Sequence, residues 1–164
     1  MKVLIVSDTH GYDDNLETVL EIEGPVDAMI HCGDVEGSED YFEALLECPV
    51  YMVRGNNDFF SNLDGELEFE LAGLKIFLTH GHYYGVSMGI ERILEEGLDR
   101  GADIVMFGHT HKPVLIQEAN ITILNPGSLT YPRQEGRKPS YFIMEIDQKN
   151  NLKFYKKMLT IKKT

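Results

Sequence analysis

Five short hydrophobic runs, each followed by residues that can bind a metal, constrain this chain more than any other feature. The runs lie at 3–6, 28–30, 50–53, 76–78 and 104–107. Short runs of this composition are typical of buried strands. Residues at the ends of such strands often form functional sites, so the positions that follow the runs are candidates for one.

The residues after the runs form five motifs, which are Asp8-Thr9-His10, Gly33-Asp34, Gly55-Asn56, His80-Gly81-His82 and Gly108-His109-Thr110-His111. Residues i and i+2 of an extended strand point to the same side. We therefore expect Asp8 with His10, and His109 with His111, to face a common centre without a bend in the chain. Carboxylate, imidazole and amide ligands together favour Mn, Fe, Co, Ni or Zn over Ca. The glycines beside these ligands would let the backbone approach a metal or substrate closely.

The histidines support this interpretation as a group. A single Asp-x-His is common by chance, where its side chains form turn and capping hydrogen bonds. Five of the six histidines of this chain, however, lie within the motifs. The joint set therefore predicts a metal site, whereas His31, inside a predicted strand, is expected to be a hydrogen-bonded core residue.

Apolar spacing along the whole chain predicts an α/β protein. Strands are expected at about 2–7, 27–32, 50–54, 66–71, 75–79, 103–107, 113–118, 121–124, 140–147 and 152–159. Helices are expected from Asp13 or Asp14 to Gly24, over 38–47 with Ser38 as the cap, and at about 87–100. In the second helix, Tyr41 or Phe42, Leu45 and Leu46 would share an apolar face. These elements predict two packed sheets with helices outside.

Size and composition indicate one domain over residues 1–164. No apolar run approaches the roughly 18 residues of a membrane span, and the first residues lack the features of a signal peptide, so a cytoplasmic protein is expected. Cys32 and Cys48 are expected to be reduced structural residues. The net charge of −12 argues against a nucleic-acid partner. A small phosphate ester attracted by local positive charge remains compatible with it.

The motifs, extended by Asn57 and Asp58 after Asn56 and by Thr79 before His80, resemble those of the calcineurin-like metallophosphoesterases, in particular the small single-domain bacterial and archaeal phosphodiesterases. The resemblance spans residues 1 to about 132. It implies a four-layer αββα sandwich of two mixed β-sheets flanked by helices. It also implies two metals, one held by Asp8, His10, Asp34 and His111 and one by Asp34, Asn56, His80 and His109, with Asp34 as the bridge.

The activity that the resemblance implies is hydrolysis of phosphate diesters by a two-metal mechanism, with a bridging water or hydroxide as the nucleophile. Manganese is the metal expected first, with nickel, cobalt, iron and zinc as alternatives. A phosphomonoesterase or a cyclic-nucleotide phosphodiesterase would use the same site. A non-catalytic scaffold of this fold is a further alternative, although no residue of the ligand set is missing here.

One departure from the family pattern affects the candidate catalytic residues, Asn57 and His82. The family commonly has histidine after the ligand asparagine, where this chain has Asn57. An amide donates a hydrogen bond but cannot supply a proton. We therefore expect diesters with good leaving groups, or a proton from His82 or from metal-bound water. His82 has as alternatives a contact to phosphate, a support for His80 or a structural role.

Three further features surround the motifs. Asp58 is expected to orient the turn before it and the ligands, and the turn 125–128 is expected to form a wall of the site. Phe59, Phe60, Tyr83 and Tyr84 are expected to be exposed near the site. They would form either a homodimer contact or a stacking surface for a base.

Overall fold

The computed structural model describes residues 1–160, and over this range ten strands form two mixed five-stranded sheets. Residues 161–164 of the expected domain lie outside the described residues. The first sheet has the order β10-β9-β1-β2-β3. Its strands are β1 (Lys2–Val6), β2 (Ala28–His31), β3 (Val50–Met52), β9 (Ser140–Ile146) and β10 (Leu152–Met158). The second sheet has the order β4-β5-β6-β8-β7. Its strands are β4 (Glu66–Leu71), β5 (Leu74–Thr79), β6 (Ile104–Met106), β7 (Pro113–Gln117) and β8 (Thr122–Pro126).

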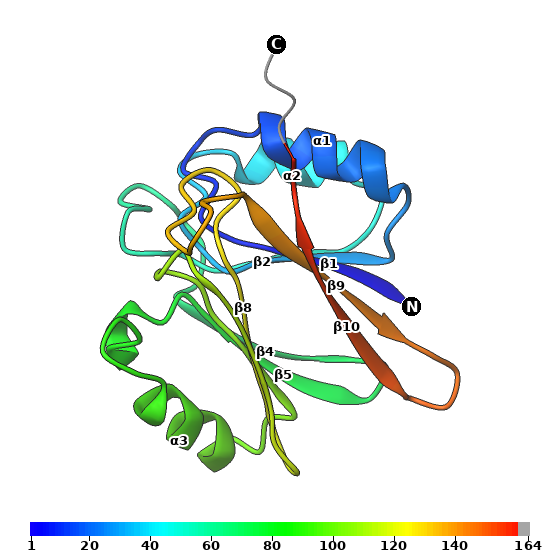
Figure 1. The fold of residues 1–164 in the computed structure, drawn as a ribbon, viewed down its shortest axis with the longest axis vertical. Helices are drawn as coiled ribbons and strands as arrows, with labels where there is room; N and C mark the ends of the chain where they lie inside the picture. The colour runs from blue at the N-terminus through cyan, green and yellow to red at the C-terminus, as the bar shows by residue number, and fades with distance from the viewer. Residues whose placement is uncertain (161–164) are drawn as a thin grey trace.

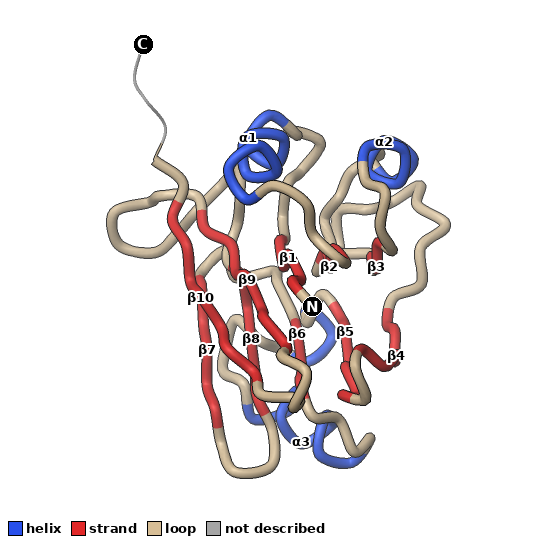
Figure 2. Tube along the Cα trace, turned by 90° about the vertical axis from the view of Figure 1, so that its right-hand side faces the viewer, coloured by secondary structure: helices blue, strands red, loops and turns tan. Residues whose placement is uncertain are grey.

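The two sheets pack face to face, and helices cover their outer faces (Figure 1). Ile5, Ile30, Ile76, Met106 and Phe142 belong to the buried cluster between the sheets. Helices α1 (Asp14–Glu23) and α2 (Glu39–Leu45) lie over the first sheet, and α3 (Glu91–Asp99) lies over the second (Figure 2). The predicted four-layer αββα sandwich of two mixed sheets is therefore confirmed.

The alternation of side chains in β1 explains these layers. Val3 and Ile5 pack between the sheets, whereas Leu4 and Val6 pack toward α1 and α2. All four are fully buried. Such a strand is covered on both faces, which is why its sequence is a continuous apolar run rather than an alternating one.

None of the helices in residues 1–160 has the length and apolar character of a membrane span.

The predicted helix caps differ from those in the structure. Asp13 and Ser38 precede α1 and α2, but neither side chain makes a capping hydrogen bond. Instead, the Ser38 hydroxyl donates to the Asp13 carboxylate at 2.6 Å, which joins the starts of the two helices. The apolar face expected on α2 is also wrong in part, because Phe42 is buried whereas Tyr41 and Leu45 are exposed.

The helix expected at 87–100 begins later, at Glu91. A short 3-10 turn occupies His82–Tyr84, and Gly89 has a φ of 154° just before the helix. The residues between Tyr84 and Glu91 therefore form the connection that leads the chain from the end of β5 to the outer face of the second sheet.

Strand direction places the motifs together. β1, β2 and β3 run parallel to one another in the first sheet, and β5, β6 and β8 do so in the second. The five motifs follow β1, β2, β3, β5 and β6, at the end of the sandwich where the connecting loops gather on the left of Figure 1. Parallel strands bring residues far apart in sequence to one edge, so this end is where a site can form.

Candidate metal centre

Two carboxylates and three imidazoles meet at this end. Asp8 Oδ1 lies 3.6 Å from His10 Nε2, 3.7 Å from His80 Nε2 and 3.2 Å from His111 Nε2. Asp34 Oδ2 lies 3.7 Å from His10 Nε2 and 3.4 Å from His80 Nε2. The ligand atoms form two groups, Asp8-His10-His111 and Asp8-Asp34-His80, each with its atoms within 4.8 Å of one another. Asp8 belongs to both groups.

Hydrogen bonds at the far side of the rings fix which nitrogen faces the centre. His80 Nδ1 lies 2.7 Å from the Cys32 carbonyl oxygen, and His111 Nδ1 lies 2.7 Å from that of Tyr131. A carbonyl oxygen only accepts, so each Nδ1 donates and each Nε2 can present a lone pair to the centre. Within residues 1–160, Asp8 Oδ1 and His80 Nε2 are buried without any hydrogen-bond partner. Acceptors that face one another in this way suit a bound cation.

The charges of the centre are strongly coupled. Burial by itself would raise the pKa of Asp8, but His80, His10 and His111 outweigh it and hold the pKa well below its usual range. For Asp34, burial is again outweighed, here by His80 and Asn57, and the pKa falls to about 2. Both carboxylates are therefore ionised at neutral pH and available to a cation.

The expected extended geometry of the Asp-x-His and His-x-His motifs is wrong. β1 ends at Val6 and β6 at Met106, before the ligands begin. Asp8, His10 and Asp34 have φ values of 55°, 50° and 57°, and His109 and His111 have φ values of 69° and 59°. These residues thus adopt the left-handed region, which is sparsely populated for non-glycine residues and concentrates at functional sites.

The neighbouring glycines make room for the ligands themselves. A Cβ at Gly55 would lie 2.1 Å from Asp34 Oδ1, and one at Gly108 would lie 2.6 Å from Asp8 Oδ2. A Cβ at Gly33, where φ is 105°, would lie 2.5 Å from His80 Nδ1. Three of the glycines therefore permit close packing against ligand side chains, a more specific role than the close approach to metal or substrate expected from the sequence.

His109 and Asn56 lie beside the second group and contact each other. His109 Nδ1 donates to Asn56 Oδ1 at 3.1 Å, and the His109 backbone N–H donates to Asp8 Oδ2 at 3.1 Å. The rings of His80 and His109 have centroids 5.2 Å apart. All seven residues expected as metal ligands are thus brought to one end of the sandwich.

The two candidate catalytic residues also lie there. The Asn57 backbone N–H donates to Asp34 Oδ1, and its side-chain Nδ2 donates to Asp34 Oδ2, both at 2.9 Å. Asn57 therefore orients Asp34, a role that sequence reasoning did not anticipate. The His82 ring centroid lies 5.4 Å from that of His80, and its Nδ1 is buried with no hydrogen-bond partner in the described part of the chain. Burial, together with His80 and His109, lowers the pKa of His82.

Asp58 organises the backbone behind the ligands. Its carboxylate accepts hydrogen bonds from the backbone N–H groups of Asp34, Val35, Glu36 and Gly55, at 2.9, 3.3, 2.6 and 2.8 Å. These bonds join the loop after β2 to the loop after β3. The prediction that Asp58 orients the turn and the ligands is confirmed.

The predicted wall and core residues are confirmed as well. Asn125 Nδ2 donates to the Gly108 carbonyl at 3.0 Å, and Ser128 Oγ donates to the Asp8 carbonyl at 2.8 Å. His31 is fully buried, accepts from the Gly33 N–H at 3.1 Å and lies 3.0 Å from Thr9 Oγ1. The end of β8 and the loop after it thereby support the last and first motifs, respectively.

Sequence reasoning missed two side chains that contact ligands. Ser7 Oγ donates to Asp8 Oδ2, and Glu36 Oε1 lies 3.0 Å from His10 Nδ1. Both are close to a ligand in sequence, which is a weak signal. The carbonyl partners of His80 and His111 have no sequence signal at all, because every residue has a carbonyl.

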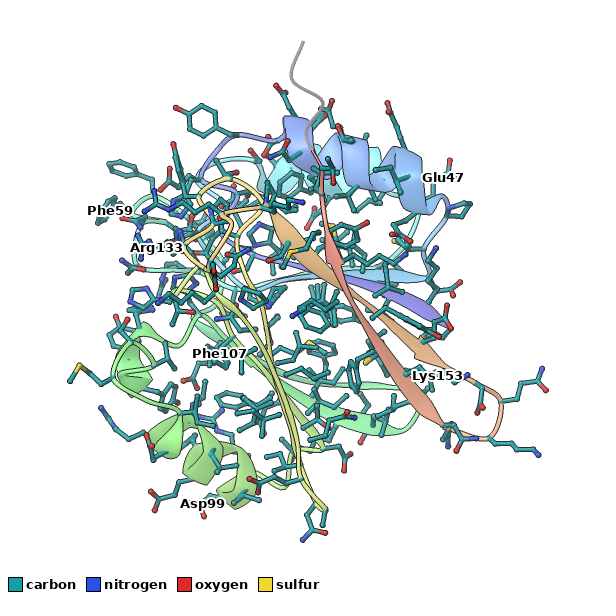
Figure 3. The ribbon with its side chains drawn as sticks, in the orientation of Figure 1. Glu47, Phe59, Asp99, Phe107, Arg133 and Lys153 are labelled. Carbon is teal, nitrogen blue, oxygen red and sulfur yellow. The ribbon has the colours of Figure 1, made fainter. Side chains whose placement is uncertain are left out.

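The surface near the centre is partly aromatic. Phe59, Phe60 and Tyr83 are exposed, and Figure 3 shows Phe59 at the surface and Phe107 inside the protein. Tyr84 was expected to be exposed and is not, because its hydroxyl donates to Glu66 and its ring packs edge-on against Phe77. A cavity of about 620 Å³ lies between α2 and the loop after β3, with Glu36, Asn57 and Phe59 among its lining residues.

The fold and this centre define a class of protein, an αββα sandwich with carboxylates and imidazoles that could hold a metal at the ends of its parallel strands. The calcineurin-like phosphoesterase superfamily domain matches residues 1–149. The chain belongs to this superfamily, and its relatives bear the names probable metallophosphoesterase and phosphodiesterase.

Two relatives and two solved structures illustrate the similarity. The probable metallophosphoesterase YsnB of Bacillus subtilis is 37% identical over 148 residues, which cover 90% of this chain and 85% of YsnB. The phosphodiesterase YfcE of Escherichia coli is 32% identical, covering 90% of this chain and 89% of YfcE. A predicted phosphoesterase from Streptococcus pneumoniae superposes with a TM-score of 0.78 at 29% identity, covering 95% and 97% of the two chains. Wild-type Vps29 of Entamoeba histolytica with zinc has a TM-score of 0.76 at 22% identity, covering 96% and 99%, and shows the fold alone.

Proposed function

We propose that this chain is a metal-dependent phosphodiesterase that hydrolyses phosphate diesters at a centre of two divalent cations. The observation that carries the proposal is the set of acceptor atoms on Asp8, Asp34, His10, His80 and His111 that face one another. Asp8 Oδ1 and His80 Nε2 are buried and have no partner within the described residues. Buried acceptors without partners are costly, and a cation between them satisfies both.

The donor set fits divalent transition metals, since imidazole and carboxylate together suit Mn, Fe, Co, Ni and Zn. Manganese is the metal we propose first. One cation would be held by Asp8, His10, Asp34 and His111, and the other by Asp34, Asn56, His80 and His109. When bound, such a pair of metals would lower the pKa of water and neutralise the phosphoryl oxygens.

Asn57 and His82 have different parts in this proposal. Asn57 holds both oxygens of Asp34 and cannot transfer a proton, so it keeps the shared carboxylate in place. Within residues 1–160, Nδ1 of His82 has no hydrogen-bond partner, so this ring can hold a proton beside the ligands. Because its pKa is lowered, His82 is neutral at pH 7 and is a weak proton source. Diesters with good leaving groups depend least on such a source.

Space beside the centre favours a diester over a monoester. The cavity of about 620 Å³ begins at Asn57 and Glu36, which contact Asp34 and His10. A diester carries two ester substituents, and such a cavity can receive the second. A monoester has only one. The name phosphodiesterase, borne by the relative YfcE, supports the same choice.

The test compares hydrolysis of bis(p-nitrophenyl) phosphate and p-nitrophenyl phosphate by protein stripped with a chelator and reloaded with Mn, Ni, Co, Zn or Mg. We expect diester hydrolysis that requires metal, that exceeds monoester hydrolysis, and that is lost in His109→Ala. Asp99→Ala, on α3 at the far side of the second sheet, is the control and should retain wild-type rates (Figure 3).

Two results would contradict the proposal and one would narrow it. Faster monoester hydrolysis would assign a phosphomonoesterase and make His82 the first residue to replace. Hydrolysis confined to cyclic nucleotides in a parallel assay would assign a narrower phosphodiesterase. Tight binding of metal without hydrolysis of any ester would favour a non-catalytic scaffold.

A further inference from the structure

Glu36 contacts the centre although it is outside the expected ligand set. Its Oε1 lies 3.0 Å from His10 Nδ1. An ionised carboxylate only accepts, so Nδ1 donates to Glu36. His10 Nε2 then faces the centre, 3.2 Å from His111 Nε2 and 3.6 Å from Asp8 Oδ1.

We propose that Glu36 is a positioning residue that fixes the tautomer and orientation of His10 and thereby sets the affinity of the metal held by the Asp8-His10-His111 group. The inference rests on the proposed function, because it requires that this group bind a metal. It assigns Glu36 no contact with substrate or with the reacting atoms.

Three of the four ligand histidines, His10, His80 and His111, have Nδ1 partners outside the ligand set, and these partners differ. His80 and His111 donate from Nδ1 to backbone carbonyls, whereas His10 donates to a carboxylate. A charged acceptor makes a stronger hydrogen bond and a more basic imidazole than a neutral one. His10 is therefore the ligand among these three whose support a side-chain substitution can remove.

The backbone of Glu36 is held independently of its carboxylate. Its N–H donates to Asp58 Oδ1 at 2.6 Å, and its φ of 57° belongs to the loop that carries Asp34. Replacement of the carboxylate by an amide should therefore leave the loop in place. The His10 side chain is 11% exposed and that of Glu36 is 35% exposed, so the contact is shielded from water on the His10 side, unlike a pair of two fully exposed side chains, which contributes little.

The same cavity wall offers a matched control. Glu39 lines the cavity together with Glu36, but no hydrogen bond from its side chain to a ligand is found among residues 1–160. Glu39→Gln removes the same charge as Glu36→Gln from the same wall. The pair of variants therefore separates the contact with His10 from the general negative charge of the cavity.

The experiment measures binding of Mn²⁺ and of Zn²⁺ to metal-free protein by isothermal titration calorimetry. Wild type should bind two equivalents. In Glu36→Gln one equivalent should bind about 10- to 100-fold more weakly, as is typical when the partner of a metal-binding histidine is removed. The second equivalent, and both equivalents in Glu39→Gln, should bind as in wild type. A ¹⁵N spectrum of the zinc-loaded wild type should show the His10 proton on Nδ1.

Other results would overturn the assignment. Unchanged affinity for both equivalents in Glu36→Gln, or a proton on Nε2 of His10, would exclude the positioning role. Equal weakening of both equivalents, with a lower melting temperature of the metal-free variant, would show a structural role instead. Failure of the wild type to bind any divalent metal would refute the proposed function itself. This result is seen in the wild type alone, whereas failure of the positioning role is seen only when Glu36→Gln is compared with a wild type that binds metal.

Discussion

Replacement of Gly55 by alanine tests whether the close packing around Asp34 is required for the metal centre. Gly55 does not have a positive φ, so alanine is not excluded by backbone conformation. Its Cβ, however, would lie 2.1 Å from Asp34 Oδ1 and 2.5 Å from the Asp34 backbone nitrogen. Because one of these atoms is backbone, a change of side-chain rotamer cannot relieve the overlap.

The magnitude follows from the displacement. Asp34 Oδ1 must move from 2.1 Å to at least 3.0 Å from the new Cβ. Overpacking of this kind costs about 1–3 kcal/mol, which lowers the melting temperature of a chain of this size by about 2–12 °C. A catalytic group displaced by about 1 Å can lower the rate about 100-fold. We therefore expect a modest loss of stability and a large loss of activity.

The assay combines thermal unfolding, metal titration and hydrolysis of bis(p-nitrophenyl) phosphate. Gly65→Ala is the matched control, since its Cβ would have Arg54 Nη2 at 3.6 Å as its neighbour, an ordinary contact. Gly65→Ala should bind metal and hydrolyse the diester as wild type does. Wild-type metal affinity and activity in Gly55→Ala would refute the argument that Gly55 makes room for Asp34.

Three further predictions concern stability. Removal of metal by a chelator should lower the melting temperature by about 5–10 °C for each site emptied, and return of metal at 100 times the dissociation constant should restore about 2.7 kcal/mol per site, as scanning calorimetry would show. Burial lowers the pKa of His31 to about 4. Between pH 6.5 and about pH 4, His31 is therefore protonated in the unfolded chain but neutral in the folded chain. Urea unfolding of metal-free protein should show about 3 kcal/mol of stability lost across this interval, and less in His31→Gln. Glu23 accepts from Tyr141 and Lys157, each at 2.7 Å, so Glu23→Ala should cost about 1–3 kcal/mol in the same assay at pH 7, and no change would contradict this.

Local pattern was sufficient for the secondary structure. The run Val3-Leu4-Ile5-Val6 is buried on both faces, and this requirement is visible in the run itself. The boundaries were less secure, because the start of α3 depends on how the chain leaves β5. The exposure of Leu45 on α2 likewise depends on how far the helix extends over the sheet.

The candidate ligands could be predicted because each requires a particular residue type at a particular place after a strand. The reason given for their convergence was nevertheless wrong. Asp8 and His10 do not lie on one side of an extended strand; they adopt left-handed backbone, held by hydrogen bonds from their N–H groups to the Gly33 and Asp34 carbonyls at 3.0 and 2.9 Å. The spacing of the motifs identified the residues correctly. Their backbone geometry, however, is set by hydrogen bonds to the loop after β2.

The sequence by itself determined the order of the strands and helices, the class of fold and the residues able to bind metal, because periodicity and residue type are local properties. The tertiary structure decided that Asp8 Oδ1 lies close to His10, His80 and His111 together, that Asn57 holds Asp34, and that Glu36 supports His10. These contacts join loops that follow different strands, and their distances are set by sheet order and backbone conformation. A pairing such as His111 with the Tyr131 carbonyl uses a group present in every residue, so only the folded chain can specify it.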